Sequence, residues 1–483
     1  MLGEEPFPEE MSSDAGGTSE PMLRKELLHR FGDSGVYRDV PFAVLFALQL
    51  LAVLVVAIAN GLGVSSEPAT AGLDSLRHDV RARQLILILC VTAITASVLA
   101  TLWLVLLRSG AKEMIWIGAC GSIALSLANG IALFVQGRAA GIFLGTLSLI
   151  TGLGCLAFIV LNRQRMEFSA QLLHTVAHLT RDYPETIYVA LGAAVVQLVW
   201  LFLWVTALSY TSERTNQAVV MVVLLLSFFW TSQLIKAIVH ATVAGTVASW
   251  YFLHPNVPRN CTARSLRRAL TTSFGSLCLG SLVAASLSTL RGIASSGSNR
   301  SSGRLHALCM CCLGFLDVLT RFFNEFAYTQ VAIYGKTFTR ASRDTWTLLV
   351  HHSGVDAIVQ RDLISSALTL GALLSGLTTA LVSGVWARAF LGDDQPQWWQ
   401  AECTGFLLGY GCTMLVSTVI QSGTNALYVC YAEDPAHLAA INQSLYALFI
   451  LRPHVPPTGP ALGGSSSYKM HGLAESTGEH GHF

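Results

Sequence analysis

Long apolar stretches recur along the chain between residues 41 and 430. A helix needs about 20 largely apolar residues to cross the hydrocarbon core of a membrane, and about ten stretches of this sequence meet that requirement. They are residues 41–62, 84–107, 114–135, 140–161, 187–208, 218–240 (continuing to 252), 270–290, 305–335, 364–390 and 402–430. The pattern predicts an all-α membrane protein, a polytopic bundle of about ten transmembrane helices.

These stretches divide the chain into a membrane domain and two tails. The N-terminal tail, residues 1–40, is acidic near its start and lacks the positive start and apolar core of a signal peptide. The C-terminal tail, residues 451–483, is rich in Pro, Gly, Ser and His. We expect residues 41–450 to form the transmembrane domain, with the first tail partly disordered and the second disordered.

Lysine and arginine are distributed unevenly between the two sides of the predicted bundle. With the N-terminus in the cytoplasm, the inner segments hold about twice as many of these residues as the outer loops, as is typical of cytoplasmic segments. We therefore expect both termini in the cytoplasm. In this orientation the glycosylation sequon at Asn299 lies on an outer loop, where it is a candidate site.

Two connections on the inner side have the pattern of amphipathic helices. In the first, Ala170, Leu173 and Val176 recur at helical spacing, and Pro184 ends the pattern. The second covers residues 337–349, where basic residues alternate with aromatic and aliphatic ones. The sequence favours helices anchored at the membrane interface for both, with a gating role as the alternative.

Composition and charge limit the classes of function. Hydrophobic residues make up 52% of the chain and charged residues 12%, about half the share of a soluble domain, and the mean hydropathy is +0.53. These values indicate an integral, multi-pass membrane protein. We expect it in the plasma membrane, with an internal membrane as the alternative. A net charge of +1 gives no reason to expect nucleic acid as a partner. We find no nucleophile with its base, no phosphate loop and no metal-ligand pattern, so we expect neither an enzyme nor a bound cofactor or metal.

The eighth apolar stretch contains an unusual number of polar side chains. Asp317, Arg321 and Glu325 follow one another at four-residue intervals, so their charges share one face of a helix. Asn324 and Tyr328 lie one turn apart beside them. Ionisable groups at membrane depth usually face the interior of a bundle or an aqueous path. The charged residues therefore form either a network that holds helices together or part of a pathway, and Asn324 and Tyr328 are candidates for a ligand-facing surface.

The sixth and tenth stretches also carry polar stripes. Gln233, Lys236 and His240 share one face of the sixth stretch at spacing i, i+3, i+7, which favours a cavity-facing role. Alternatively, Lys236 pairs with an acidic residue of the eighth stretch, Asp317 or Glu325. Gln421 and Asn425 lie one turn apart on the tenth stretch. We expect the three polar faces to converge on one aqueous cavity, which is typical of a transport pathway.

Short motifs in and after the eighth stretch point to a known family. The most specific are Asn324, Ala327-Tyr328, Ile333-Tyr334-Gly335, Phe338 and Arg343-Asp344. Supporting motifs, in chain order, are Pro184, Trp230, Ala244-Gly245, Trp250-Tyr251-Phe252, Phe274-Gly275-Ser276, Gly280-Ser281 and Cys430-Tyr431-Ala432-Glu433-Asp434. Together these motifs resemble the choline transporter-like family, the solute carrier 44 type, over roughly residues 160–450.

The resemblance implies ten spans, cytosolic termini and transport of choline or a related organic cation without sodium. A quaternary ammonium group has no N–H donor, so its binding sites rely mainly on aromatic faces. We expect Trp230, Asn324 and Tyr328 to line the substrate site. Further candidates are Gln233, Tyr334, Gln421 and Asn425. For Trp230 and Tyr334 the alternative is a packing or interfacial role.

The sequence departs from the family in two places. The first outer loop, expected at about residues 63–83, is short, and Glu325 stands where a basic or polar residue is common. The second departure leaves the identity of the substrate open. Two other classes of function also remain: a membrane scaffold or lipid-organising protein whose polar stripes only hold helices together, and a channel.

Overall fold

The computed structural model describes residues 36–64, 74–110, 163–211, 217–296, 303–351, 364–391 and 398–450, and only scattered residues of 111–162. Within these residues the regular structure is entirely helical. The long helices are α2 (Val40–Val64), α3 (Asp74–Ser109), α7 (Glu185–Thr211), α8 (Gln217–Leu253), α10 (Phe274–Ser296), α11 (Gly303–Tyr334), α14 (Ile364–Leu391) and α15 (Trp398–Glu433). The shorter helices are α6 (Arg163–Asp182), α9 (Cys261–Leu270), α12 (Phe338–His351), α16 (Pro435–Ile441) and α17 (Gln443–Ile450).

Seven helices in the described part are long and apolar enough to cross a membrane: α2, α3, α7, α8, α10, α14 and α15. The prediction of an all-α, multi-pass membrane protein is confirmed. Helix α11 covers the eighth predicted stretch but is not among the seven, and many of the side chains in its first two thirds lie outside the described part. The described residues within 114–135 and 140–161 are helical, although most of both stretches lies outside the described residues. The number of ten spans therefore stays a prediction.

Two boundaries differ from the sequence-based expectation. The outer loop expected at 63–83 is wrong in its extent, because α2 continues to Val64 and α3 already begins at Asp74. The seventh predicted stretch starts at residue 274 rather than 270, and the separate helix α9 precedes it. Helix α9 is amphipathic and only 10 residues long, so an apolar-length criterion does not detect it. Of the two predicted tails, residues 1–35 and 451–483 lie outside the described residues.

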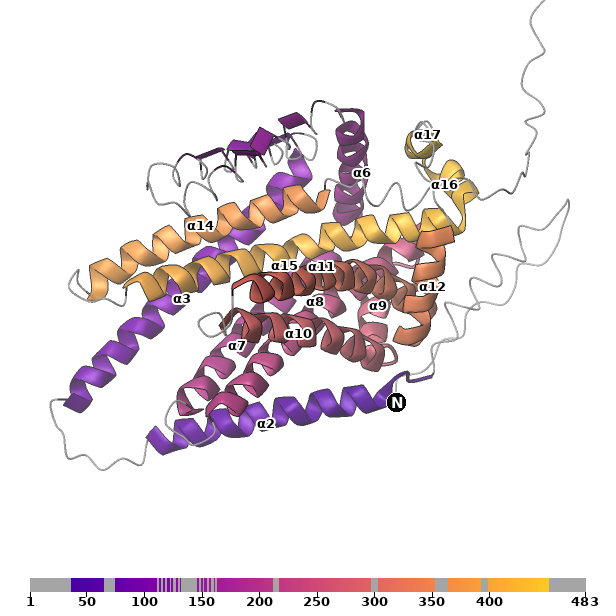
Figure 1. The fold of residues 1–483 in the computed structure, drawn as a ribbon. Helices are drawn as coiled ribbons and strands as arrows, with labels where there is room; N and C mark the ends of the chain where they lie inside the picture. Colours follow the sequence, from indigo (N-terminus) through magenta and orange to yellow (C-terminus); the bar gives the residue numbers. More distant parts are fainter. Residues whose placement is uncertain are drawn as a thin grey trace, which may run out of the picture.

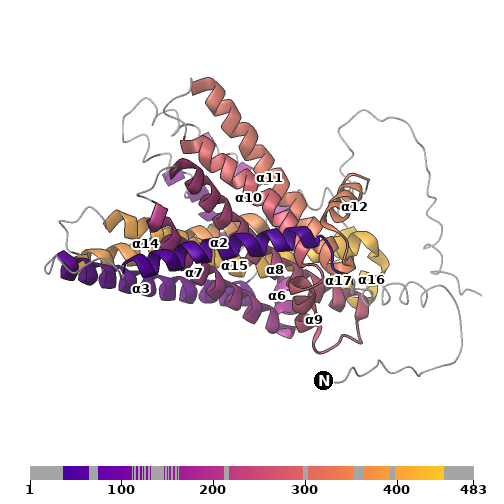
Figure 2. The same ribbon diagram turned by 90° about the horizontal axis from the view of Figure 1, so that it is seen from below.

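Helix α8 occupies the centre of the bundle. It packs against α7, α9, α10, α11 and α15, while α14 and α15 lie side by side and both contact α3 (Figures 1 and 2). With 37 residues, α8 is longer than the roughly 20 residues that span a hydrocarbon core, so it extends beyond the membrane or tilts within it. Its central position brings the polar face of the sixth stretch next to both α11 and α15.

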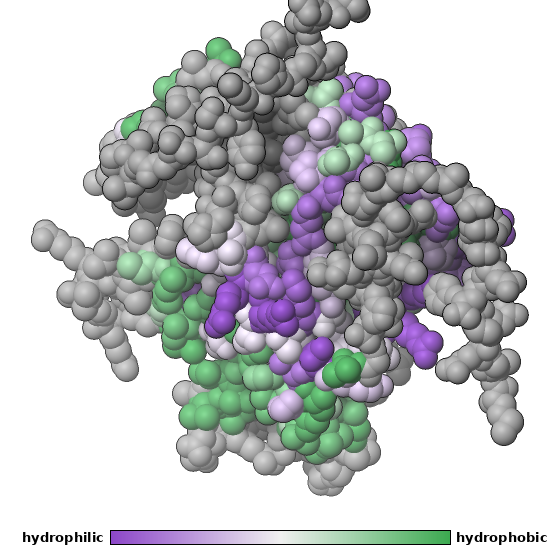
Figure 3. All heavy atoms as spheres, turned by 90° about the vertical axis from the view of Figure 1, so that its right-hand side faces the viewer, coloured by the Kyte–Doolittle hydropathy of each residue, from purple (hydrophilic) through white to green (hydrophobic). Residues whose placement is uncertain are grey.

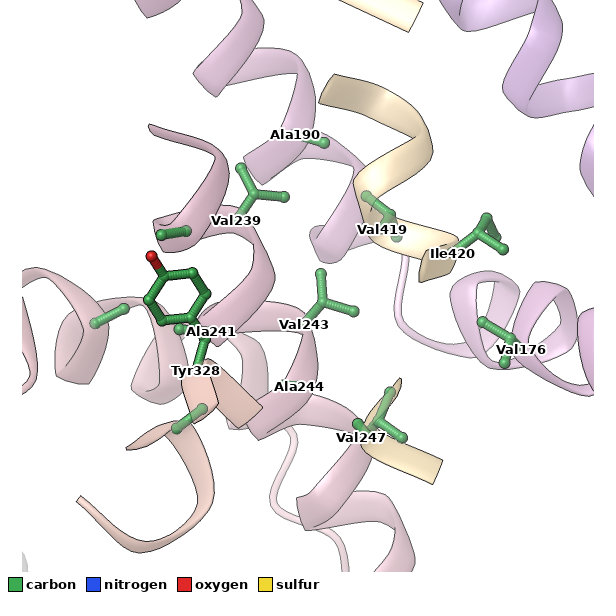
Figure 4. Packing of buried hydrophobic residues seen from close by; sticks show 14 of the residues in the cluster. Val176, Ala190, Val239, Ala241, Val243, Ala244, Val247, Tyr328, Val419 and Ile420 are labelled. Atoms are coloured by element: carbon green, nitrogen blue, oxygen red, sulfur yellow. The ribbon is translucent and has the colours of Figure 1, made fainter. Parts of the chain in front are cut away.

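Small side chains on α8 allow its neighbours to approach closely. Ala241, Val243 and Ala244 are almost completely buried, and they lie between Tyr328 of α11 and Val419 of α15 (Figure 4). In lipid, apolar side chains gain little free energy by associating with one another. Helices in membranes therefore usually associate where small residues let their backbones approach closely. This packing fixes the distance between the polar faces of α8, α11 and α15.

Short helices gather at the end of the bundle where α2 begins and α11 ends (Figure 1). Hydrophilic residues are concentrated over this end, which includes α9 and α12 (Figure 3). Exposed arginines of this region are Arg259, Arg264, Arg267, Arg340 and Arg343. By contrast, large apolar side chains are exposed along α2, α3 and α7, as is expected for surfaces that face lipid.

Both predicted amphipathic segments form helices. In α6 the side chains of Ala170, Leu173 and Val176 are buried, and the helix packs against α3, α14 and α15. Helix α12 follows α11 after a sharp turn at Gly335, whose φ of +62° lies in the left-handed region that glycine adopts without steric cost. The turn places the first residue of α12, Phe338, against the side of the bundle.

Candidate functional site

Two helices, α8 and α15, bring polar side chains to one carboxylate inside the bundle, that of Glu325 on α11. Its Oε1 atom lies 3.2 Å from Lys236 Nζ of α8. Its Oε2 atom accepts hydrogen bonds from Gln421 Nε2 at 3.0 Å and from Asn425 Nδ2 at 3.2 Å, both on α15. Both oxygens are therefore bound, which offsets the cost of placing a charge inside the bundle. Lys236 thus pairs with Glu325 and also lines the cavity described below, so both of its predicted arrangements occur together.

A second polar contact joins the same helices one turn further along. His240 Nε2 of α8 lies 3.0 Å from Thr329 Oγ1 of α11, and His240 Nδ1 lies 2.9 Å from Ser422 Oγ of α15. The histidine is buried, with 1% of its surface exposed. Since both ring nitrogens have hydroxyl partners, His240 is held in place without contacting the Glu325 carboxylate.

A small cavity opens beside the Lys236–Glu325 ion pair. It is lined by Gln233, Lys236, Ala237, His240, Ala284, Asn324, Glu325 and Tyr328. The space open to the centre of a water molecule is about 20 Å³, which holds about one water molecule. An organic cation such as choline is larger, so the bundle has to widen before such a molecule can enter.

Tyr328 forms an aromatic wall of this cavity. Its ring centroid lies 6.1 Å from that of His240 and 5.9 Å from that of Phe338, which packs against it from the side of α12. The side chain is 7% exposed, and its hydroxyl has no hydrogen-bond partner among the described residues. Gly280 of α10 leaves room for both rings, because a Cβ atom there would lie 2.6 Å from Tyr328 Cε1 and 2.5 Å from Phe338 Cε2.

Asn324 and Gln233 also line the cavity but have different surroundings. Asn324 Nδ2 donates a hydrogen bond to the carbonyl oxygen of Gly280 at 3.1 Å, which ties α11 to α10. Gln233 has no side-chain partner among the residues that the structure describes, so its amide is open to the cavity. The structure thus brings Gln233, Asn324 and Tyr328 to one cavity, and Gln421 and Asn425 to its carboxylate.

Trp230 and Tyr334 do not line this cavity. Trp230 is buried between α2 and α10, where its Nε1 donates to the carbonyl oxygen of Cys278 at 3.1 Å and its ring meets Phe46 at 5.3 Å. Tyr334 is the last residue of α11, and Lys336 Nζ lies 4.5 Å from its ring centroid. These surroundings correspond to the packing alternative for Trp230 and to a contact at the helix end for Tyr334.

Three predicted residues have no described side chain. Asp317 and Arg321 lie within α11, but their side chains are outside the described part, so their place in a charge network stays a prediction. Asn299 lies outside the described residues altogether. Among the described residues, no group of three His, Cys, Asp or Glu side chains could hold a metal ion.

Several motif residues meet at the end of α11. Gln330 Nε2 donates to Glu433 Oε1 of α15 at 3.3 Å, and Lys336 Nζ donates to Gln330 Oε1 at 3.3 Å. Lys336 also forms an ion pair of 2.8 Å with Asp344 of α12. Tyr251 of α8 donates to the carbonyl oxygen of Asp434 at 2.7 Å. These contacts fasten the ends of α8, α11, α12 and α15 to one another.

Sequence analysis missed Asp39, which lies just before α2. Its Oδ2 atom accepts a hydrogen bond from Ser276 Oγ of α10 at 2.6 Å and another from the backbone N–H of Phe338 at 3.1 Å. The first N–H groups of a helix have no partner inside the helix, so Asp39 supplies one to α12. Asp39 and Phe338 are 299 positions apart, and no local pattern in the sequence signals such a contact.

Thr329 and Ser422, the partners of His240, were also missed. Both lie four residues or fewer from predicted polar residues, Glu325 and Gln421. Serine and threonine commonly hydrogen-bond the backbone of their own helix, as both do here, so their presence in an apolar stretch is a weak signal.

Comparisons with known proteins agree with these motifs. A family model described as plasma-membrane choline transporter matches residues 146–436. The chain is similar to a protein named CTL-like protein from Dictyostelium discoideum, with 29% identity over 427 residues, which cover 86% of this chain and 75% of that protein.

Fungal proteins named PNS1 are similar to the chain as well. The one from Eremothecium gossypii is 29% identical over 443 residues, covering 83% of this chain and 78% of that protein. The one from Mycosarcoma maydis is 27% identical over 444 residues, covering 85% of this chain and 82% of that protein. The region matched by the family model contains α8, α10, α11 and α15 in full, and therefore the cavity and all its described lining residues.

Proposed function

Because the chain belongs to the choline transporter-like family, we propose that it carries choline or a related organic cation across a membrane by alternating access, without an enzymatic step. The observation that carries this proposal is the position of Glu325. Glu325 and the aromatic residue Tyr328 line the same cavity, which lies between α8, α10 and α11. A negative charge beside an aromatic ring is suited to a cation that has no N–H donor.

Each of the two groups contributes a different part of cation recognition. The ring of Tyr328 attracts a quaternary ammonium through the negative face of its π system, an interaction of about 0.5–2 kcal/mol. The Glu325 carboxylate supplies a countercharge that is stronger inside the bundle than in water, because the surrounding dielectric is lower. Gln233 and Asn324 border the same space and offer amide groups to a hydroxyl or other polar part of the solute.

The size of the cavity supports a carrier that changes conformation. Space for about one water molecule is too small for an open pore or for choline, so access from either side requires helices to move. Phe338 packs behind Tyr328 on the side of α12, and movement of α12 away from the bundle would open the cavity in that direction. Alternating access of this kind relies on rigid bodies that rock around a site near the middle of the membrane.

The proposed arrangement in the membrane has ten spans with both termini in the cytoplasm, in the plasma membrane. Two observations support the orientation. The exposed arginines of α9 and α12 lie at the end of the bundle where α2 begins, as the positive-inside rule requires of a cytoplasmic end. Helix α17, the last described helix, lies at the same end (Figure 1).

The proposal is tested by uptake of labelled choline into proteoliposomes that contain the purified full chain. We expect saturable uptake, with KM raised about tenfold in Tyr328→Ala, since the cation loses an aromatic face. We expect a larger loss in Glu325→Gln, which keeps the shape of the side chain and removes its charge. Tyr188→Ala is the matched control, because Tyr188 on α7 is 70% exposed and lies outside the cavity.

The same assay separates the other two functions. Flux that rises linearly with choline concentration would indicate a channel. The absence of flux for choline and for other organic cations, with folded protein in the vesicles, would favour a scaffold whose polar stripes only hold helices together.

A further inference from the structure

The cavity already contains a cation. Its described lining includes one carboxylate, that of Glu325, and one ammonium group, that of Lys236, and the two are 3.2 Å apart. A monovalent organic cation that enters this cavity meets a pair without net charge rather than a free negative group. Unless the pair opens, the like charge of Lys236 repels the incoming cation.

We propose that Lys236 occupies the place of the substrate's cationic group and competes with it for Glu325. Lys236 is thereby a specificity-determining residue that sets the affinity for monovalent organic cations. The proposal rests on the transport function proposed above and goes beyond it, since it assigns to the lysine a role opposed to substrate binding.

The position of Lys236 permits it to leave Glu325. The side chains of Lys236 and Glu325 are 28% and 17% exposed, so both reach the cavity rather than a closed core. Within the described part of the chain, the Lys236 ammonium forms a hydrogen bond with Glu325 Oε1 alone. Lysine is a point charge on a flexible four-carbon stem, which can turn aside without movement of the α8 backbone.

Glu325 remains in place when the lysine leaves. Its second oxygen, Oε2, accepts hydrogen bonds from Gln421 and Asn425, and neither involves Lys236. The carboxylate is thus oriented from α15 while its Oε1 atom faces α8. One cation can therefore replace another at Oε1 while the hydrogen bonds at Oε2 remain. A binding group that is already held in its bound position is preorganised.

The small volume of the cavity also favours the displacement of Lys236 by the substrate. The free volume beside the pair holds about one water molecule, and the lysine stem forms part of the wall. Displacement of Lys236 adds its volume to the cavity at the point where Tyr328 and Glu325 both face it. His240 does not take over the carboxylate, because its two ring nitrogens are bound to Thr329 and Ser422.

The experiment compares choline uptake by four variants of the full chain in proteoliposomes. Lys236→Met removes the ammonium and keeps an unbranched stem, and we expect it to lower KM about tenfold. Lys236→Arg keeps the competing charge and should not lower KM. Glu325→Gln and the double variant should both show a raised KM, since neither keeps the carboxylate that binds the cation, and the Lys236 ammonium remains as a repelling charge only in the single variant.

The result that overturns the inference is a KM that is unchanged or raised in Lys236→Met while the wild type transports choline saturably. In that case the proposed transport stands and the competition does not. A folded Lys236→Met protein that no longer transports would instead assign Lys236 to an anionic group of a zwitterionic substrate. If Lys236→Met fails to fold, Lys236→Gln, which can still donate a hydrogen bond to Glu325, decides by the same KM comparison. Absence of saturable uptake in the wild type and every variant would reject the transport function itself.

Discussion

Gly280 has no side chain, which leaves space for the two aromatic rings that close the cavity on one side. The Tyr328 and Phe338 rings fill the space in front of this residue, and both side chains are 7% exposed. A buried ring can yield only by displacing its own neighbours, because the packing of protein interiors is dense. The shape of the proposed site therefore depends on a residue without functional groups.

We expect Gly280→Ala to destabilise the protein by about 1–3 kcal/mol and to reduce transport, since its methyl group overlaps both rings. Thermal unfolding in detergent measures the first effect and uptake the second. Gly192→Ala on α7 is the control, because a Cβ atom there meets nothing within 4 Å, and alanine is a better helix former than glycine. Equal melting temperatures for the Gly280→Ala protein and the wild type would show that the rings have room to adjust.

The polar residues of the cavity could be predicted because they are rare in apolar stretches and occur at helical spacing. Lys236 and Glu325 were identified in this way, as were Gln421 and Asn425. The pairing itself could only be stated as an alternative, since helical spacing fixes a face and not the neighbour that it meets. Trp230 shows the limit of the approach, because an aromatic residue in a span has the same signature whether it binds a solute or packs, as here against Phe46.

At the scale of helices, α12 is held at its first residue by a side chain from another part of the chain. The Asp39 carboxylate accepts the N–H of Phe338 and is itself fixed by Ser276 of α10. A negative charge at the start of a helix also interacts favourably with the helix dipole. The position of Phe338, which packs against the cavity residue Tyr328, is therefore coupled to the start of α2.

We expect Asp39→Gly to loosen α12 at its start. Glycine relieves the left-handed conformation of residue 39, φ +52°, so the variant removes the hydrogen bonds without adding backbone strain. Faster hydrogen–deuterium exchange at residues 338–342 would report the change, and by the usual cost of a lost cap we expect about 1 kcal/mol of local stability to be lost. Asp39→Asn is the companion variant, because asparagine tolerates the same backbone and its amide oxygen can still accept hydrogen bonds from Ser276 and Phe338. Unchanged exchange in the Asp39→Gly protein would mean that Asp39 does not hold α12.

A helix could be predicted where its length and its hydrophobic periodicity are visible within one continuous segment of the sequence. The long apolar helices and the amphipathic α6 and α12 follow from the sequence, because their patterns cover at least three turns. Helix α9 was missed, as were α16 and α17, which have 7 and 8 residues. Helices this short depend on tertiary contacts for their stability, and those contacts are not visible in a local pattern.

The orientation of the whole molecule is open to a direct test. With both termini in the cytoplasm, epitope tags at residue 1 and residue 483 should bind antibody only after the cells are permeabilised. A tag inserted in residues 65–73, between α2 and α3, should be accessible on intact cells. A terminal tag accessible on intact cells would contradict the proposed topology, and with it the assignment of α9 and α12 to the cytoplasmic side.

The ion pair between Lys236 and Glu325 has an electrical consequence for the complete molecule. With the pair closed, these two groups contribute no net charge to the interior, whereas an organic cation that has taken the place of Lys236 adds one positive charge. A voltage across the membrane then does work on this site when it is loaded and not when it is empty, about 2.3 kcal/mol per charge for each 100 mV. As far as this pair is concerned, the membrane potential favours movement of the loaded site in one direction and leaves the return of the empty site unaffected.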